Sequence, residues 1–148
     1  MAWDASKIFM ALIEDVLENT TAMDMNSDSF KVALYDNDIT PDQTVTSANT
    51  AYNAGQWTAS GNEVSDGTEW DAGGEPLANP TSTRSTNVYT FDGDNTVSGG
   101  SSATLAAVFG CLVYDDTIAA PVADQGVSYH YFGGTNSVTD GTFTVVWN

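Results

Sequence analysis

The spacing of the apolar residues changes once along this chain, and that change is the strongest limit on its fold. Residues 4–18 carry the only convincing helical pattern, with Asp4 or Ser6 as the expected N-cap and 19–21 as the exit. From Ser29 onward the period becomes two, which is typical of strands with one buried face. The strands are expected within segments 29–36, 87–91, 103–115, 127–132 and 142–147.

Turn signals, mainly Asp-Gly and Gly-Gly pairs, separate the strand segments. Segment 103–115 is apolar on both faces, as a central strand or pair of strands would be. Several short strands after one helix predict a mainly β protein, an antiparallel β-sandwich or small barrel with one N-terminal amphipathic helix. A chain of 148 residues supports one core. The helix and linker (1–28) and the β-sandwich domain (29–148) are therefore expected to fold as a single unit.

The predicted helix is apolar over too wide an arc for one contact. At about 100° per residue its apolar side chains sweep about 200°, whereas a helix that packs on its own sheet needs a stripe of a little over 100°. The excess predicts a second burial surface, either on a loop of the same chain or on a neighbouring subunit. We expect Phe9, Met10, Ile13 and Leu17 to contact another subunit in a symmetric oligomer.

The charge of the chain excludes two classes of partner. Lys7, Lys31 and Arg84 stand against 20 acidic residues, and the formal net charge is −17. Nucleic-acid backbones require several cations and anionic membranes require a basic patch, so neither partner is expected. Cys111 is the single cysteine and lies in an apolar run, which favours a buried, unreactive thiol. The N-terminal residues do not resemble a signal peptide, and run 103–114 is too short to span a membrane as a helix, so we expect a soluble chain made in the cytoplasm.

The acidic loops offer candidate cation and catalytic sites. Segments 36–42 and 91–100 have the spaced carboxylates of calcium loops, but neither completes the EF-hand pattern, so surface turns are favoured over a cation site. A glycosidase needs two carboxylates at a defined separation, and sequence does not give that distance. The carboxylates concerned are Glu63, Glu69, Asp71 and Glu75. His130 lies on one face of a strand, which favours a structural role over a general base. No catalytic residue, metal ligand or cofactor is expected, and the chain is predicted not to be an enzyme.

The loop that holds these four carboxylates is interpreted as a turn pinned by one aromatic side chain. Asp66 and Gly67 supply a turn signal, and Trp70 is the expected apolar anchor. Gly73 and Gly74 permit positive φ before the chain returns to the core. The predicted role of the loop is therefore structural.

Four ordered segments of the chain are similar to those of a known family. They are 30–42 (FKVALYDNDITPD), 62–80 (NEVSDGTEWDAGGEPLANP), 109–117 (FGCLVYDDT) and 131–148 (YFGGTNSVTDGTFTVVWN). Together these segments resemble the small virion structural proteins of tailed bacteriophages and related tailed viruses, capsid decoration or minor head proteins. Trp70 matches the aromatic position before the family's Ala-Gly-Gly segment. The resemblance covers nearly the whole chain and carries over no catalytic residue.

The resemblance implies a virion structural protein, with capsid decoration as the main expectation. Such a cement protein would bind the major capsid protein on the outer capsid surface and stabilise the shell. The apolar arc of the helix adds the expectation of a homo-oligomer, for example a trimer. The alternative is a tail- or fibre-associated binding module, a lectin-like β-sandwich that contacts the host surface. Copy number separates the two, because a decoration protein is present in many copies per particle and a tail module in few.

Overall fold

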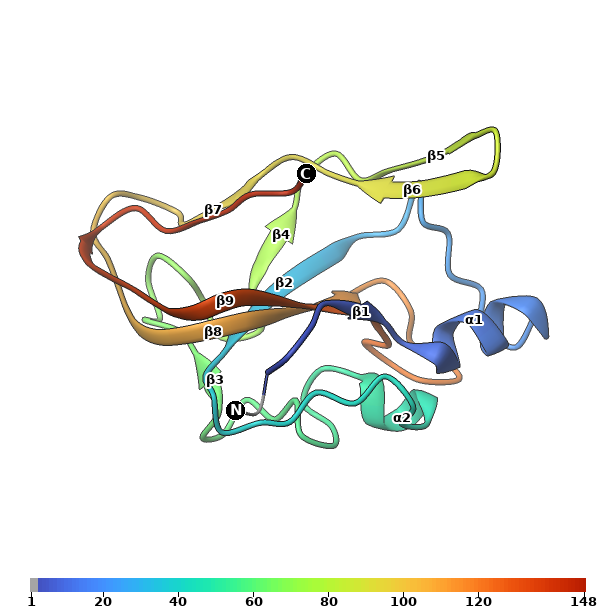
Figure 1. The fold of residues 1–148 in the computed structure, drawn as a ribbon, viewed down its shortest axis with the longest axis horizontal. Helices are drawn as coiled ribbons and strands as arrows, with labels where there is room; N and C mark the ends of the chain where they lie inside the picture. Colours follow the sequence, from blue (N-terminus) through green and yellow to red (C-terminus); the bar gives the residue numbers. More distant parts are fainter. Residues whose placement is uncertain (1–2) are drawn as a thin grey trace.

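The computed structural model describes residues 3–148, and antiparallel strands make up most of its regular structure (Figure 1). Two short helices accompany the strands, α1 (Met10–Leu17) and α2 (Ser47–Thr50). The strands are β1 (Lys7–Ile8), β2 (Phe30–Tyr35), β3 (Glu63–Val64), β4 (Glu75–Leu77), β5 (Thr81–Ser85), β6 (Val88–Asp92), β7 (Thr96–Val97), β8 (Ala103–Asp115), β9 (Gly126–Gly141) and β10 (Thr144–Val145). Within the described residues, no helix is long and apolar enough to cross a membrane.

One antiparallel sheet forms the centre of the fold. Its strands lie in the order β1-β9-β8-β2-β3, and β4 also pairs with β2. Strand β2 pairs with β8 along its whole length, from Phe30 opposite Asp115 to Tyr35 opposite Gly110. Two further two-stranded sheets, β7–β10 and β5–β6, complete the structure. The mainly β, sandwich-like fold predicted from the sequence is confirmed, and the strands of residues 3–148 do not close into a barrel.

Both faces of the central strand β2 are covered by the chain itself. Phe30 packs edge-on against Phe91 of β6, with ring centroids 4.9 Å apart. Tyr35 packs edge-on against Trp57, with centroids 5.1 Å apart. Because side chains alternate across a strand, these two contacts lie on opposite faces. Figure 1 shows the two small sheets above the central sheet and the segment that carries α2 below it.

An aromatic cluster fixes the N-terminal segment to the sheet face that Trp57 covers. Its members, Trp3, Phe9, Trp57 and Tyr129, are each at most 1% exposed. Phe9 lies 5.4 Å from Tyr129 and 6.0 Å from Trp57 between ring centroids, both edge-to-face. This arrangement is the favoured one for aromatic pairs. The cluster therefore holds residues before α1 in the core.

The structure corrects the predicted helix over residues 4–18, because α1 begins only at Met10. Phe9 is the N-cap residue, with extended backbone (φ −69°, ψ 132°) and no side-chain cap. Neither Asp4 nor Ser6 is therefore the N-cap. The physical reason is burial: the extended backbone carries the Phe9 ring into the aromatic cluster, and this tertiary packing overrides the helical period.

Strands β5 and β6 form a hairpin that projects from the body (Figure 1). Thr86 and Asn87 make its two-residue turn, since Ser85 pairs with Val88. Most of its side chains are exposed, and contact with the core is made by Phe91 near its base. The sequence predicted β6 but not β5, because β5 contains no apolar residue from which a period could be read.

Candidate interaction surface

Helix α1 buries one side and exposes an apolar face on the other. Ala11 and Leu12 point into the body and are each 7% exposed. The exposed residues, named the α1 face from here on, are Met10 (49%), Ile13 (41%), Val16 (50%) and Leu17 (80%). Phe9 was predicted to join them, but it is 0% exposed and belongs to the core, so this part of the predicted interface is wrong. The subunit contact of Met10, Ile13 and Leu17 stays a prediction.

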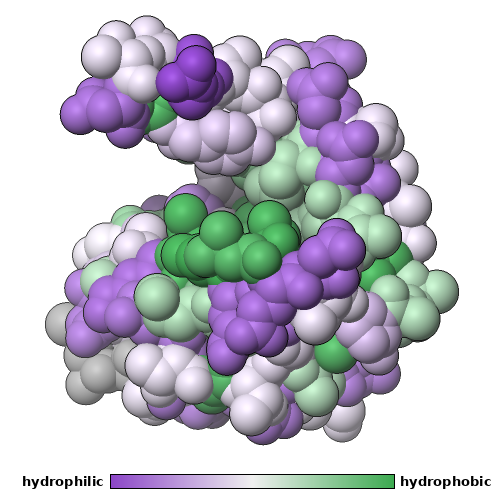
Figure 2. Space-filling model, turned by 90° about the vertical axis from the view of Figure 1, so that its right-hand side faces the viewer, coloured by the Kyte–Doolittle hydropathy of each residue, from purple (hydrophilic) through white to green (hydrophobic). Residues whose placement is uncertain are grey.

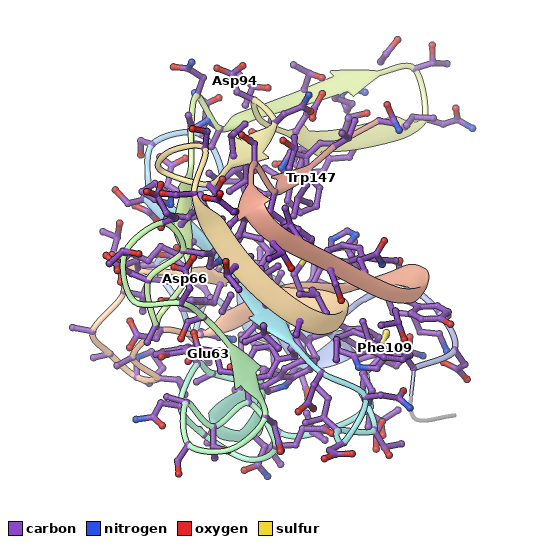
Figure 3. All side chains as sticks on the ribbon, turned by 90° about the vertical axis from the view of Figure 1, so that its left-hand side faces the viewer. Glu63, Asp66, Asp94, Phe109 and Trp147 are labelled. Carbon is purple, nitrogen blue, oxygen red and sulfur yellow. The ribbon has the colours of Figure 1, made fainter. Side chains whose placement is uncertain are left out.

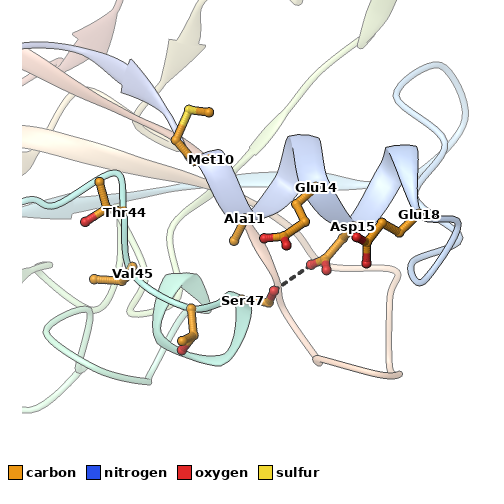
Figure 4. Close-up of a pocket in the computed structure, with 9 residues that line it drawn as sticks. Met10, Ala11, Glu14, Asp15, Glu18, Thr44, Val45 and Ser47 are labelled. Atoms are coloured by element: carbon orange, nitrogen blue, oxygen red, sulfur yellow. Dashed lines mark hydrogen bonds between the residues drawn. The ribbon is translucent and has the colours of Figure 1, made fainter.

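The α1 face lies in a hollow and has an acidic border. Figure 2 shows a hydrophobic patch on the side of the molecule that α1 occupies, with a projecting arm above it. That arm is the β5–β6 hairpin. At about 100° per residue, the exposed residues Glu14 and Glu18 run along one edge of the apolar stripe. The α1 face therefore lies in the hollow, and the two carboxylates, one turn apart, border it on the side of residues 44–47 (Figure 4).

Asp15 fixes the orientation of α1. Its Oδ2 accepts hydrogen bonds from Ser47 Oγ at 2.6 Å (Figure 4) and from Gln125 Nε2 at 2.8 Å. Burial opposes ionisation, but the hydrogen bonds from Ser47, Gln125 and Thr20 outweigh it and lower the pKa of Asp15. An open depression of about 420 Å³ lies between α1 and residues 44–47. Because Asp15 ties α1 to the body on that side, the α1 face is held outward.

The hairpin turns an aromatic ring and a cation toward its inner side. Residues two apart share a face of a strand, and directly paired residues share a face of a sheet. Tyr89, paired with Arg84, therefore lies on the same face as Phe91, which packs into the core. Tyr89 is 61% exposed. The Arg84 guanidinium donates a 3.4 Å hydrogen bond to the Thr86 carbonyl and has no salt-bridge partner within residues 3–148.

One carboxylate and one indole order the loop between β3 and β4. Trp70 is fully buried and packs edge-on against Phe143, with centroids 5.8 Å apart. Asp66 Oδ1 accepts the backbone N–H groups of residues 68–70 at 2.8 to 3.1 Å, and its Oδ2 accepts that of Thr104 at 3.0 Å. The Trp70 N–H bond and the other three outweigh partial burial and lower the pKa of Asp66 well below its usual range.

Two glycines bring the end of this loop against the central sheet. Gly73 and Gly74 have φ of 95° and 84°, and a Cβ on Gly74 would collide with the backbone of Val32. The Gly73 N–H donates to Glu63 Oε1 at 2.7 Å, and the Tyr114 hydroxyl donates to the Gly73 carbonyl at 2.6 Å. Only a residue without a side chain fits at Gly74, so the loop and β2 meet directly.

Three of the four carboxylates considered for glycoside hydrolysis accept hydrogen bonds from other residues of the chain. Glu63 Oε2 accepts the Tyr52 hydroxyl at 2.9 Å, and burial, opposed by its hydrogen bonds, raises the pKa of Glu63. Glu69 Oε1 accepts the Ser102 hydroxyl, and Glu75 Oε1 accepts the backbone N–H of Asp71. Glu63, Glu69 and Glu75 therefore each have a structural partner. Asp71 takes part only through its backbone N–H, which donates to Glu75.

The two calcium-like segments form local turns. Asp36 Oδ1 accepts the Asp38 N–H at 2.9 Å, and Asp92 Oδ1 accepts the Gly93 N–H at 2.8 Å. Asp94 lies beside the small sheets, apart from the loop that holds Glu63 and Asp66 (Figure 3). In residues 3–148, no group of three or more His, Cys, Asp or Glu side chains could hold a metal ion.

Cys111 lies inside the protein, and His130 is partly buried. The His130 Nε2 is 2.9 Å from Ser128 Oγ, and the ring meets Trp147 edge-on at 5.1 Å. Burial lowers the pKa of His130 to about 4. Cys111 is free and fully buried, and burial raises the pKa of its thiol far above its usual range. Neither group is exposed as a reactive side chain would be.

The sequence indicated the α1 face but not the inner side of the hairpin. The signal for Tyr89 and Arg84 was present only as a strand pattern in 87–91, and their pairing across the turn required the register of β5. No protein-family model, curated protein or solved structure matches the chain. Its function is therefore inferred from its own surfaces and from the family resemblance of its four segments.

Proposed function

We propose that this chain is a virion structural protein, a capsid decoration protein that binds the outer surface of the shell and stabilises it. The observation that carries the proposal is the α1 face. A chain with net charge −17 keeps four large apolar side chains exposed on one anchored helix. Exposed contiguous apolar patches commonly mark sites of protein association. The resemblance of the four sequence segments supports a virion as the place of that association.

Charge supports an external position for the protein. Packaged DNA lines the interior of a capsid, and a chain with 20 acidic residues and three cations would meet like charge there. On the outside, acidic groups are screened over about 8 Å at physiological ionic strength and help to keep particles dispersed. The major capsid protein is accordingly the proposed partner, and no nucleic acid, membrane, metal or catalytic step enters the proposal.

The test uses particles assembled without this protein. Such particles should form, release DNA at a lower temperature than complete particles, and regain stability when the purified chain is added back. A chain with Ile13→Asp and Leu17→Asp should restore less, because a charged group would replace the apolar contact. The matched control is Asp71→Asn, an exposed change outside the α1 face.

Two results would contradict the proposal. The first is that particles without the protein are as heat-stable as complete ones. The second is a count of only a few copies per particle, confined to the tail, which would favour the binding-module alternative.

A further inference from the structure

The β5–β6 hairpin and the α1 face have complementary chemistry. Residues 81–91 contain one cation and no acid. The inner side of the hairpin presents Tyr89 and Arg84, and the α1 face presents apolar side chains bordered by Glu14 and Glu18. The Tyr89 ring could pack on the aliphatic side chains of the α1 face, and the Arg84 guanidinium could pair with the two carboxylates.

The two surfaces belong to one hollow but remain open to each other in the single chain. Figure 2 shows the hairpin above the hydrophobic patch with free space between them. The hairpin is fixed at its base by Phe91 against Phe30, and the α1 face is held outward by Asp15. A single copy therefore carries both halves of a contact and leaves each of them exposed.

We infer that two copies of this chain associate by exchanging hairpins, so that Tyr89 and Arg84 of each copy lie on the α1 face of the other. The hairpin and the α1 face border the same hollow. One two-fold axis between two copies therefore forms both contacts at once and leaves neither surface free for a third copy. Specific interfaces bury about 800 Å² per partner. Five exposed side chains, Met10, Ile13, Val16, Leu17 and Tyr89, supply its apolar centre.

This contact rests on the proposed function and deepens it: the α1 face would join two copies into the unit that decorates the shell, so its effect on shell stability would act through that pairing. It is tested on the free protein, so its failure is distinguishable from failure of the capsid proposal, which is judged on particles. A two-fold pair also differs from the trimer named as an example in the sequence analysis.

The experiment is sedimentation equilibrium of the purified chain and of charge-reversal variants at physiological ionic strength. The wild-type chain should form dimers. Arg84→Glu should raise the dimer dissociation constant by about tenfold or more, because two charge pairs become repulsive. Glu14→Lys with Glu18→Lys should do the same, although it makes the chain less acidic and so favours association in general. Combining all three changes should restore the wild-type constant.

Two controls separate the contact from folding and from net charge. The three reversed side chains are exposed, so each variant should keep the wild-type melting temperature of the monomer. Asp71→Lys, an exposed reversal elsewhere, should leave dimerisation unchanged or strengthen it slightly.

The inference is overturned if the wild-type chain stays monomeric at its highest soluble concentration. It is also overturned if the glutamate reversals weaken a dimer while Arg84→Glu does not, because the hairpin would then not be the occupant. Weakening by both, without recovery in the combined variant, would equally exclude the proposed pairing.

Discussion

Asp66 shows how one carboxylate can order a whole loop. It accepts four backbone N–H groups, three from its own turn and one from Thr104 in β8. Asp66→Asn keeps the shape but removes the charge and turns one acceptor atom into a donor. We expect it to lower the free energy of unfolding by roughly 1–2 kcal/mol. Solvent next to the partly exposed carboxylate screens its charge and keeps the loss in this range. Urea unfolding at neutral pH would measure this.

The matched control is Asp71→Asn in the same loop, whose carboxylate is exposed. It should change the free energy of unfolding by less than about 0.5 kcal/mol. Equal effects of the two substitutions would show that the backbone hydrogen bonds of Asp66 do not order the loop.

His130 makes stability depend on pH. Burial lowers its pKa to about 4, whereas the unfolded chain titrates near 6.5. The unfolded state therefore binds more protons between these values, so the His130 contribution is complete above pH 6.5 and is lost as pH falls toward 4. At pH 5 the loss should be about 2 kcal/mol. Burial of Asp115 raises its pKa and so acts in the opposite sense over part of this range.

A His130→Gln variant separates the two effects, because Asp115 is unchanged in it. Its free energy of unfolding should fall by about 2 kcal/mol less than that of the wild type between pH 7 and pH 5. Denaturant unfolding of both proteins at the two pH values provides the comparison. Identical falls would mean that His130 titrates normally in the folded protein.

Strand β8 contains an irregularity at Ala107, which can be tested by removing the methyl group of that residue. Its pairing with β9 shifts register on both sides of Leu105 and Val108, and Ala107 lies there with φ of 57°. An L-residue in this left-handed region is strained, whereas glycine is not. Ala107→Gly should therefore raise the free energy of unfolding by about 0.5–1 kcal/mol.

Ala106→Gly is the control for this strand, since Ala106 is also exposed but its φ is not positive. It should lower the free energy of unfolding by about 0.5–1 kcal/mol, because glycine loses more backbone freedom on folding. Thermal unfolding of the two variants side by side checks the opposite signs. Destabilisation by both would place Ala107 in an ordinary strand conformation.

The sequence predicted elements where one periodic pattern dominated and failed where distant contacts decided the backbone. Strand β2 was predicted from its period-two pattern and is present, but both of its faces are buried where that pattern is typical of one buried face. The start of α1 was placed too early, because nothing local indicates that Phe9 joins Trp57 and Tyr129. Strand β5 was missed because it packs few side chains and is defined by its pairing with β6.

The candidate interaction surface was also predicted only in part from the sequence. The width of the apolar arc predicted exposed residues on α1, and Met10, Ile13 and Leu17 are exposed. Which residues of that arc face the core depends on the approach of the chain to the sheet, so Phe9 was assigned to the wrong side. The inner side of the hairpin required a cross-strand register that single-sequence patterns do not contain.

The whole molecule combines a two-sided core, a net charge of −17, and two projecting or apolar surface features, the hairpin and the α1 face. Lys31 is already paired with Asp116 at 3.2 Å. Of the two other cations, Arg84 lies on the hairpin and Lys7 on β1. Contacts with a capsid would therefore be mainly apolar, and most of the 20 acidic residues would face solvent.

The most direct test is carboxylate-directed chemical labelling of intact particles, read residue by residue by mass spectrometry. The exposed members of the 20 acidic residues serve as the reporters for this chain. Proteins enclosed with the DNA serve as the shielded control, and disrupted particles give the fully accessible reference. An outer decoration protein should be labelled in intact particles at most of the exposed carboxylates that label after disruption, with protection confined to one face. Labelling that appears only after disruption would contradict an outer position.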